Sequence, residues 1–333
     1  MKRLAPAVAA LAAAMVFSGC GSSAADKAAS SAGGSGSAAG FPAQVTSCTE
    51  SLTFDKAPER VVVIGGTSAS ILDSLGLLDH VVARAGDPGF ADADPDLQSR
   101  IDRIPEIESS GNSTGGRVVS TEAILSVHPD LVIGYDSGAD RNALRDAGIP
   151  LYAPDAFCDE LTLDRASWDD VEQEITKTAT IFGVTDKVPA LMDDIHSQID
   201  GLQQGPAAGQ SAAALYLTPG SGVFYAYGNS SMIQPIFEAN GLRNSYEDSR
   251  ERVFDASMED LLTRNPQWLV LMGDSGTTAE QLTETLNGIS GSADLQAVKN
   301  GHVLYLPFRL TDPPNTLSVQ GAVRLSQLIG EAQ

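Results

Sequence analysis

The chain has 333 residues, of which 42% are hydrophobic and 6% aromatic, and its 21 basic and 43 acidic residues give a formal net charge of -22. Because this charge repels nucleic acid and anionic membrane surfaces, we expect no nucleic-acid partner. The length allows two domains, each with its own hydrophobic core.

The chain begins with an export signal. Two basic residues precede an apolar run over residues 4–17, and small residues stand directly before Cys20, so residues 1–19 are interpreted as a signal peptide. Residues 17–20, Phe-Ser-Gly-Cys, resemble the lipobox of bacterial lipoproteins, whose cysteine is acylated and becomes the mature N-terminus. This resemblance implies lipidation at Cys20 and anchoring to the outer face of the cell membrane. An ordinary signal peptide that contains a cysteine is the alternative.

A stretch of Ala, Gly and Ser follows Cys20. Residues 21–40 contain no aromatic and no branched aliphatic side chain. Such a segment cannot bury enough surface to offset the entropy of ordering. We therefore predict a disordered tether over residues 20–40, with the lipidated cysteine at its start.

The remaining cysteines form an even pair. If lipid modifies Cys20, only Cys48 and Cys158 remain. In an exported protein the oxidising compartment favours a disulfide between them, and two free thiols are the alternative.

The first folded segment reads as a strand, a glycine turn and a helix. Apolar residues 61–64 precede Gly65 and Gly66, helical spacing of apolar residues follows over 68–78, and a short strand is expected at 81–84. The glycines lack the G-x-G-x-x-G spacing that brings backbone amides to a pyrophosphate, so nucleotide binding is not expected.

An internal repeat organises the rest of the chain. Residues 120–134 and 257–273 both contain Ser-x-Glu, six residues and a proline, followed by an apolar run. In each copy the serine can cap a short helix, the proline ends it, and the apolar run forms a parallel strand. The repeat predicts two equivalent α/β lobes.

Two helical stripes lie between the copies, and the second, over residues 186–202, is long enough to connect the lobes. The expected fold is therefore α/β, with two doubly wound, Rossmann-like lobes joined by a single long helix. The predicted boundaries are an N-terminal lobe over 41–184, a connecting helix over 185–204 and a C-terminal lobe over 205–333.

The motifs together resemble the class III periplasmic binding proteins, the substrate-capturing subunits of ABC importers for ferric siderophores, haem and cobalamin. The segments that carry the resemblance are 58–63, Pro-Glu-Arg-Val-Val-Val; 75–82, Leu-Gly-Leu-Leu-Asp-His-Val-Val; 122–133; 148–150, Gly-Ile-Pro; 227–232, Tyr-Gly-Asn-Ser-Ser-Met; and 259–271. The family implies a ligand cleft between the lobes and a binding function without catalysis. It also implies transfer of the ligand to the transmembrane subunits of an ABC permease. We expect a monomer.

The resemblance assigns one exposed glutamate on each lobe to contacts with arginines of the permease. By the motif match these are Glu122 and Glu259. A carboxylate in a first helical turn is also stabilised by the helix dipole without any partner, which is the alternative reading.

Ligand contacts are expected where open α/β sheets bind ligands, at the carboxyl ends of their strands. The candidates are Arg84, Arg117, Tyr135, Tyr225, Tyr227, Asn229 and Arg309. Arg117 matches the position of an arginine in the hydroxamate-siderophore binders of the family, and guanidinium groups would complement an anionic ferric chelate. Tyr225 and Tyr227 either line the cleft or pack in the core.

Other ligands and activities are weighed against the ferric chelate. Gly115 and Gly116 precede Arg117 where haem binders of the family often carry a tyrosine, which disfavours haem, while cobalamin stays open. No metal site and no resident cofactor are expected, because the four histidines show no metal-ligand spacing. Residues 273–276, Gly-Asp-Ser-Gly, match a serine-protease tetrapeptide, but with no visible triad we expect no catalytic residue. A surface enzyme on the same two lobes is the remaining alternative.

Overall fold

The computed structural model describes residues 40–86, 89–111, 117–134, 138–158, 161, 163–202 and 205–332, and residues 37–333 form one compact unit. The side chain of Arg117 is not described. The predicted signal peptide, Cys20 and the tether as far as residue 39 lie outside the described residues.

The part of the chain before residue 183, here called the N-lobe, is built on a parallel sheet in the order β4-β3-β7-β8. Its strands are β3 (Val61–Ile64), β4 (Val81–Ala85), β7 (Leu131–Gly134) and β8 (Leu151–Tyr152). Every residue of β3 and β7 is buried, as expected for strands with both faces of the sheet covered.

Successive residues of β3 enter different hydrophobic cores. Val61 and Val63 pack with residues of α1 and α5, whereas Val62 and Ile64 pack with residues of α3 and α4. The helices of the N-lobe are α1 (Thr67–Ser74), α2 (Pro95–Ile101), α3 (Thr121–Ser126), α4 (Arg141–Asp146) and α5 (Trp168–Phe182), with 3-10 turns η1 (Leu78–His80) and η2 (Asp155–Phe157). The sheet is thus covered by helices on both faces, as doubly wound folds are.

Two small antiparallel pairs complete the N-lobe. The first is the hairpin of β1 (Ala43–Ser47) and β2 (Glu50–Phe54), and the second pairs β5 (Ser110–Gly111) with β6 (Arg117–Val118). Strand β1 packs against α5. The hairpin was not anticipated, although the alternating burial of β1 is the pattern of a strand with one covered face.

The part after residue 204, the C-lobe, is built on a mixed sheet in the order β12-β10-β9-β13-β14, with β11 also pairing with β9. Its strands are β9 (Ser211–Leu217), β10 (Phe224–Tyr227), β11 (Arg243–Asn244), β12 (Val253–Ala256), β13 (Trp268–Met272) and β14 (Val303–Tyr305). Strands β9, β11, β13 and β14 are parallel, and β10 and β12 run antiparallel to their neighbours.

The helices of the C-lobe also cover both faces of its sheet. They are α7 (Ile233–Ala239), α8 (Met258–Arg264), α9 (Ala279–Gly288), α10 (Gln296–Lys299) and α11 (Ser318–Glu331), with 3-10 turns η4 (Ser292–Asp294) and η5 (Phe308–Leu310). Residues of α8, α9 and α10 share one core with the sheet, and residues of α7 and α11 share the other.

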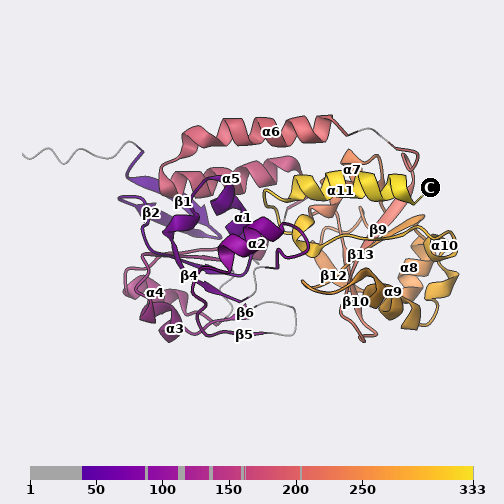
Figure 1. The fold of residues 1–333 in the computed structure, drawn as a ribbon, viewed down its shortest axis with the longest axis horizontal. Coiled ribbons are helices and arrows are strands. Elements are labelled where there is room, and N and C mark those ends of the chain that lie inside the picture. Colours follow the sequence, from indigo (N-terminus) through magenta and orange to yellow (C-terminus); the bar gives the residue numbers. More distant parts are fainter. Residues whose placement is uncertain are drawn as a thin grey trace, which may run out of the picture. The chain divides into compact units, whose positions relative to one another are not determined.

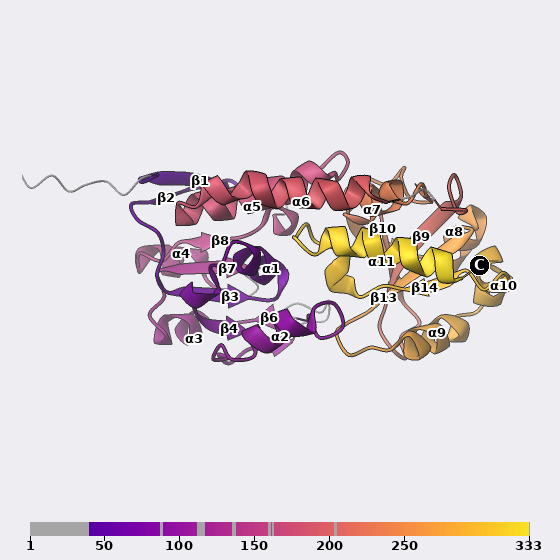
Figure 2. The same cartoon turned by 45° about the horizontal axis from the view of Figure 1, so that its top comes forward.

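The connecting helix is α6 (Val188–Asp200), preceded by the 3-10 turn η3 (Thr185–Lys187). It contacts α5 of the N-lobe and α11 of the C-lobe, and Figures 1 and 2 show it beside both helices. Helix α5 ends at Gly183, whose φ of 69° lets the chain turn into η3. Helix α6 is four residues shorter than the predicted range of 186–202.

The internal repeat folds as predicted. Ser120 and Ser257 cap α3 and α8, accepting hydrogen bonds from the backbone nitrogens of Ala123 and Asp260, each at 3.1 Å. The buried strands β7 and β13 follow. Across the described part of the chain, no helix has the length and apolar character required to span a bilayer.

Candidate functional site

On the N-lobe edge, Arg84 lies on β4 and its guanidinium is engaged inside its own lobe. Nη1 donates to the carbonyl of Gly86 at 2.9 Å, and the group forms ion pairs with Glu106 at 3.2 Å and Asp102 at 3.7 Å. Only 14% of the side chain is exposed. The adjoining cavity of about 10 Å³, lined by Gly65 and Arg84 among others, has room for no more than about one water.

The side chains of two further N-lobe candidates, Arg117 and Tyr135, lie outside the described part of the structure. The backbone of Arg117 lies in β6 opposite Gly111, and its side chain lies outside the described part of the structure. Tyr135, which follows β7, lies outside the described residues altogether. Both stay predictions.

On the C-lobe, aromatic side chains gather at the junction of β9, β10 and η5. The ring of Phe308 lies edge to face with Tyr216, with centroids 5.3 Å apart, and 6.4 Å from the ring of Tyr227. The half-buried Arg309 places its Cζ 5.6 Å from the Phe308 ring centre, within the range of a cation–π contact. Of these four residues, sequence reasoning named only Tyr227 and Arg309.

The hydroxyl of Tyr216 donates to the carboxylate of Asp274, which follows β13. Burial and the nearby carboxylate raise the pKa of the Tyr216 hydroxyl, and the charge of Arg309 opposes this shift. The phenol is therefore neutral at physiological pH and keeps its role as a donor.

A buried ion pair adjoins the same rings. The carboxylate of Asp312 has no exposed surface, pairs with Arg252 and accepts the backbone N–H of Met232 at 3.0 Å. Burial first, and Asp312 next, raise the pKa of the Tyr227 hydroxyl, while the charge of Arg252 opposes them. Arg252 and Asp312 were missed at the sequence level. Tyr216, Tyr227, Arg252, Phe308 and Arg309 are together called the C-lobe wall.

The predicted residues of β10 and the following turn lie close to this wall. Tyr225 pairs with Tyr216 across β9 and β10 and is half-buried. Tyr227 is 3% exposed and contributes to the hydrophobic core. Asn229 donates its backbone N–H to the carbonyl of Ser249 at 2.9 Å, and its buried side-chain oxygen has no hydrogen-bond partner among the described residues.

The C-lobe wall lies where the two lobes touch. From the N-lobe, Asp92 accepts the backbone N–H of Gly276 at 3.0 Å. A Cβ placed on Gly89 would lie 2.9 Å from Nε of Arg309, so these segments are in direct contact. In a second contact between the lobes, the N–H of Ala166 in the N-lobe donates to the carbonyl of Asn229 at 2.8 Å. The structure therefore brings N-lobe backbone against the predicted C-lobe residues Asn229 and Arg309.

The two predicted docking glutamates have matching environments. Glu122 and Glu259 are each the second residue of their helix, α3 and α8, and both are exposed. Neither forms an ion pair with another residue in the described ranges. A permease contact would therefore displace no partner that the structure shows.

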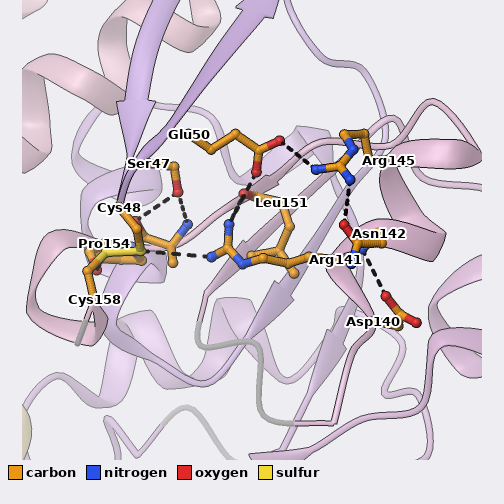
Figure 3. Close-up of polar contacts among 11 residues, drawn as sticks. Ser47, Cys48, Glu50, Asp140, Arg141, Asn142, Arg145, Leu151, Pro154 and Cys158 are labelled. Carbon is orange, nitrogen blue, oxygen red and sulfur yellow. Dashed lines mark hydrogen bonds and ion pairs between the residues drawn. A yellow bond between two sulfur atoms is a disulfide. The ribbon is translucent and has the colours of Figure 1, made fainter. Parts of the chain in front are cut away.

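The cysteines after the tether are bonded in the structure, with Sγ atoms of Cys48 and Cys158 joined at 2.06 Å. The bond links the β1–β2 turn to the segment after β8. Figure 3 shows Arg141 reaching toward Cys48 and toward Glu50, with Nη2 4.0 Å from Sγ and Nη1 3.7 Å from the carboxylate. Arg145 holds the same carboxylate at 3.4 Å, so the turn is fastened to α4 as well.

A family model described as "Periplasmic binding protein" matches residues 61–310 of this chain. The chain belongs to the periplasmic binding proteins. Proteins of this family bind solutes and are not enzymes, and this one is a class III binding protein of an ABC importer. No group of three or more His, Cys, Asp or Glu side chains that could hold a metal ion is found among the described residues.

Individual relatives of this periplasmic binding protein agree with that assignment. A crystal structure of an ABC-type Fe3+-hydroxamate transport system from Saccharomonospora viridis has 32% sequence identity and a TM-score of 0.80, covering 87% of this chain and 99% of that one. The vitamin B12-binding protein of Pectobacterium carotovorum is 22% identical over 68% of this chain and 75% of its own. The Bacillus subtilis substrate-binding lipoprotein YvrC, itself uncharacterised, is 21% identical over 87% and 86%.

Proposed function

We propose that this periplasmic binding protein captures an iron(III) complex of the hydroxamate-siderophore type and delivers it unchanged to its permease. The observation that carries the proposal is the C-lobe wall, where rings from β9, β10 and η5 meet two arginines at the contact between the lobes. The relative from S. viridis, named as an Fe3+-hydroxamate transport system, supports the ligand class.

The chemistry of the wall suits such a complex. A hydroxamate chelate presents an organic scaffold outside and a ring of oxygens around the iron. The faces and edges of Tyr216 and Phe308 can pack against the scaffold, while guanidinium N–H groups donate to the oxygens. No covalent step is required, because the iron stays inside its chelate.

A titration tests this function. Fluorescence of the exported protein is followed while ferric hydroxamates, other ferric chelates, haem and cobalamin are added in turn. We expect saturable binding of a ferric hydroxamate and weak or no response to haem and cobalamin. Tight binding of cobalamin without response to any ferric complex would reject the proposal, and chemical turnover of a chelate or ester would indicate an enzyme.

Cobalamin is the second candidate for the ligand. The relative from P. carotovorum is named as a vitamin B12-binding protein, and an aromatic wall can also pack against a corrin ring. The same titration separates the two, because it includes both ligands.

Delivery requires docking, for which we propose Glu122 and Glu259 as the contacts with arginines of the permease. Their exposure at the first turns of α3 and α8 supports this role. Changing both to arginine should abolish uptake of the iron complex by cells while the affinity of the purified protein stays unchanged. A loss of affinity instead would place the two glutamates in the ligand site.

We further propose that Cys20 carries the lipid anchor and that the protein acts as a monomer at the outer face of the membrane. The relative YvrC is named as a lipoprotein, which supports the anchor. Cys20→Ser should move the protein from the membrane fraction to the soluble fraction. Unchanged membrane association would reject lipidation at this residue.

A further inference from the structure

The charges that contact the C-lobe wall nearly cancel. Arg252 and Arg309 supply two positive charges. Asp312 pairs with Arg252, and Asp274 accepts from Tyr216. A third carboxylate, Asp92, accepts the backbone N–H of Gly276, two residues after Asp274. With Arg117 left uncounted, because its side chain is not described, the wall carries no excess of positive charge. A site that complements an anionic chelate, as expected from the sequence, would carry such an excess.

The pair of Arg252 and Asp312 is the central element of this balance. Asp312 has no exposed surface, whereas 27% of the Arg252 side chain is exposed. Removing the Asp312 carboxylate from water costs several kcal/mol, and apolar residues of the same volume are often as stabilising. The pair is therefore poorly explained by stability alone.

Arg252 carries more hydrogen-bond donors than its pair with Asp312 uses. A guanidinium group has five N–H donors, and among the described residues one of them, on Nη1, is bonded, to Asp312. The other donors belong to a partly exposed side chain on the residue before Val253, which pairs with Tyr227 across β10 and β12. Arg252 can thus donate to ligand oxygens, while the adjacent carboxylate cancels its charge.

We propose that the Arg252–Asp312 pair makes the site select ferric chelates of low net charge, with Arg252 as a ligand donor and Asp312 as the residue that limits its charge. This inference rests on the proposed function and specifies its substrate class. Iron(III) bound by three hydroxamates is neutral, whereas iron(III) bound by three catecholates carries three negative charges. Both place six oxygens around the same ion, so charge is a major difference between them.

The experiment compares the affinities of the exported full-length protein for a ferric tris-hydroxamate and a ferric tris-catecholate. The wild type should bind the neutral complex at least about tenfold more tightly, with little dependence on ionic strength. Asp312→Asn, which keeps an acceptor for the Met232 N–H, should shift the ratio toward the catecholate by roughly tenfold and make catecholate binding salt-sensitive.

A matched control removes a carboxylate from another arginine pair. Asp248→Asn breaks the pair of Asp248 with Arg264, which are 2.7 Å apart, and should leave the ratio unchanged. If Asp312→Asn does not fold, Arg252→Gln carries the test. It should weaken the hydroxamate complex about tenfold in protein whose circular dichroism is native.

The outcomes distinguish failure of the proposed function from failure of the inference about Arg252 and Asp312. If the wild type binds neither complex, the proposed function fails, and this inference with it. Equal or tighter binding of the catecholate by the wild type overturns the inference and leaves the proposed function intact. So does an Asp312→Asn variant with an unchanged ratio, or an Arg252→Gln variant with unchanged affinity for the hydroxamate.

Discussion

In the N-lobe, Arg84 bonds to Gly86 and Glu106 within its own lobe, whereas in the C-lobe Arg309 lies over Phe308 and against the Gly89 of the other lobe. An arginine near the carboxyl end of a parallel strand therefore makes contacts within its own lobe in one case and across the lobes in the other. The described polar groups of the N-lobe edge hold that lobe together, and those of the C-lobe wall are the ones that we propose to contact the ligand. Substitutions in the first set should change stability, and those in the second should change affinity.

The largest effect on stability should come from the disulfide of the N-lobe. The bond joins residues 110 positions apart, and replacing Cys48 and Cys158 by serine should lower the free energy of unfolding by about 4 kcal/mol. Affinity for the iron complex should not change where the variant is folded. Denaturant titration measures the loss, with Cys20→Ser as the control. An unchanged unfolding free energy, or two titratable thiols in the native protein, would contradict the bond.

The largest effect on affinity should come from Arg309 of the C-lobe wall. Arg309→Ala should weaken binding of the ferric complex by roughly 100-fold, because it removes a charged donor from a partly dehydrated surface. Arg84→Ala should instead cost about 1 kcal/mol of stability, since its ion-pair partners are half exposed. Parallel titrations and thermal melts of the two variants distinguish them. An equal loss of affinity in both would place Arg84 in the site, as the sequence suggests.

A third prediction concerns pH and the fully buried Glu174 on α5. Its carboxylate accepts the hydroxyl of Tyr152 at 2.7 Å and the N–H of Asp155 at 2.9 Å, yet burial raises its pKa to about 7. The folded state holds the proton of the Glu174 carboxyl more tightly than the unfolded state does. The protonated carboxyl therefore stabilises the fold, and this contribution is complete below about pH 4.5. It is lost as pH rises through 7.

Glu174→Gln should remove that loss, which amounts to about 1–3 kcal/mol between pH 5 and 8. Unfolding free energies measured across this range for both proteins provide the check, and ligand affinity should keep the same pH profile in both. If the wild type and the variant lose stability in parallel, Glu174 is not the titrating group.

The smallest expected change in affinity comes from a substitution at the contact between the lobes. Gly89→Ala places a methyl group 2.9 Å from Nε of Arg309 and should weaken ligand binding by about threefold. Gly148→Ala is the matched control, because Gly148 has the same φ of 76° and no atom within 4 Å of its added Cβ. Both variants carry the same backbone strain, so a loss of affinity in Gly89→Ala alone reports the contact with Arg309.

Much of the fold could be predicted from the sequence, because it depends on local patterns. The serine caps, the stopping prolines and the apolar runs of the repeat act within a few residues, and they gave the helices and parallel strands of both lobes in the right places. The β1–β2 hairpin was overlooked although its alternation was visible.

The C-lobe wall could be predicted only in part, because it depends on contacts between distant segments. Arg252 and Asp312 lie 60 residues apart and belong to no motif, so only the folded chain brings them together. Phe308 and Tyr216 read as ordinary core residues in the sequence. Arg309 could be named because it lies shortly after the parallel strand β14, near the edge where open sheets bind ligands.

The central claim is that the C-lobe wall holds the iron complex, and locating the iron tests it most directly. Crystals of the protein grown with a ferric tris-hydroxamate would give an anomalous difference peak at the iron absorption edge. We expect one peak beside Phe308, within reach of the guanidinium groups of Arg252 and Arg309. A peak beside Arg84 and away from these side chains would contradict it, as would crystals that take up cobalamin but no iron complex.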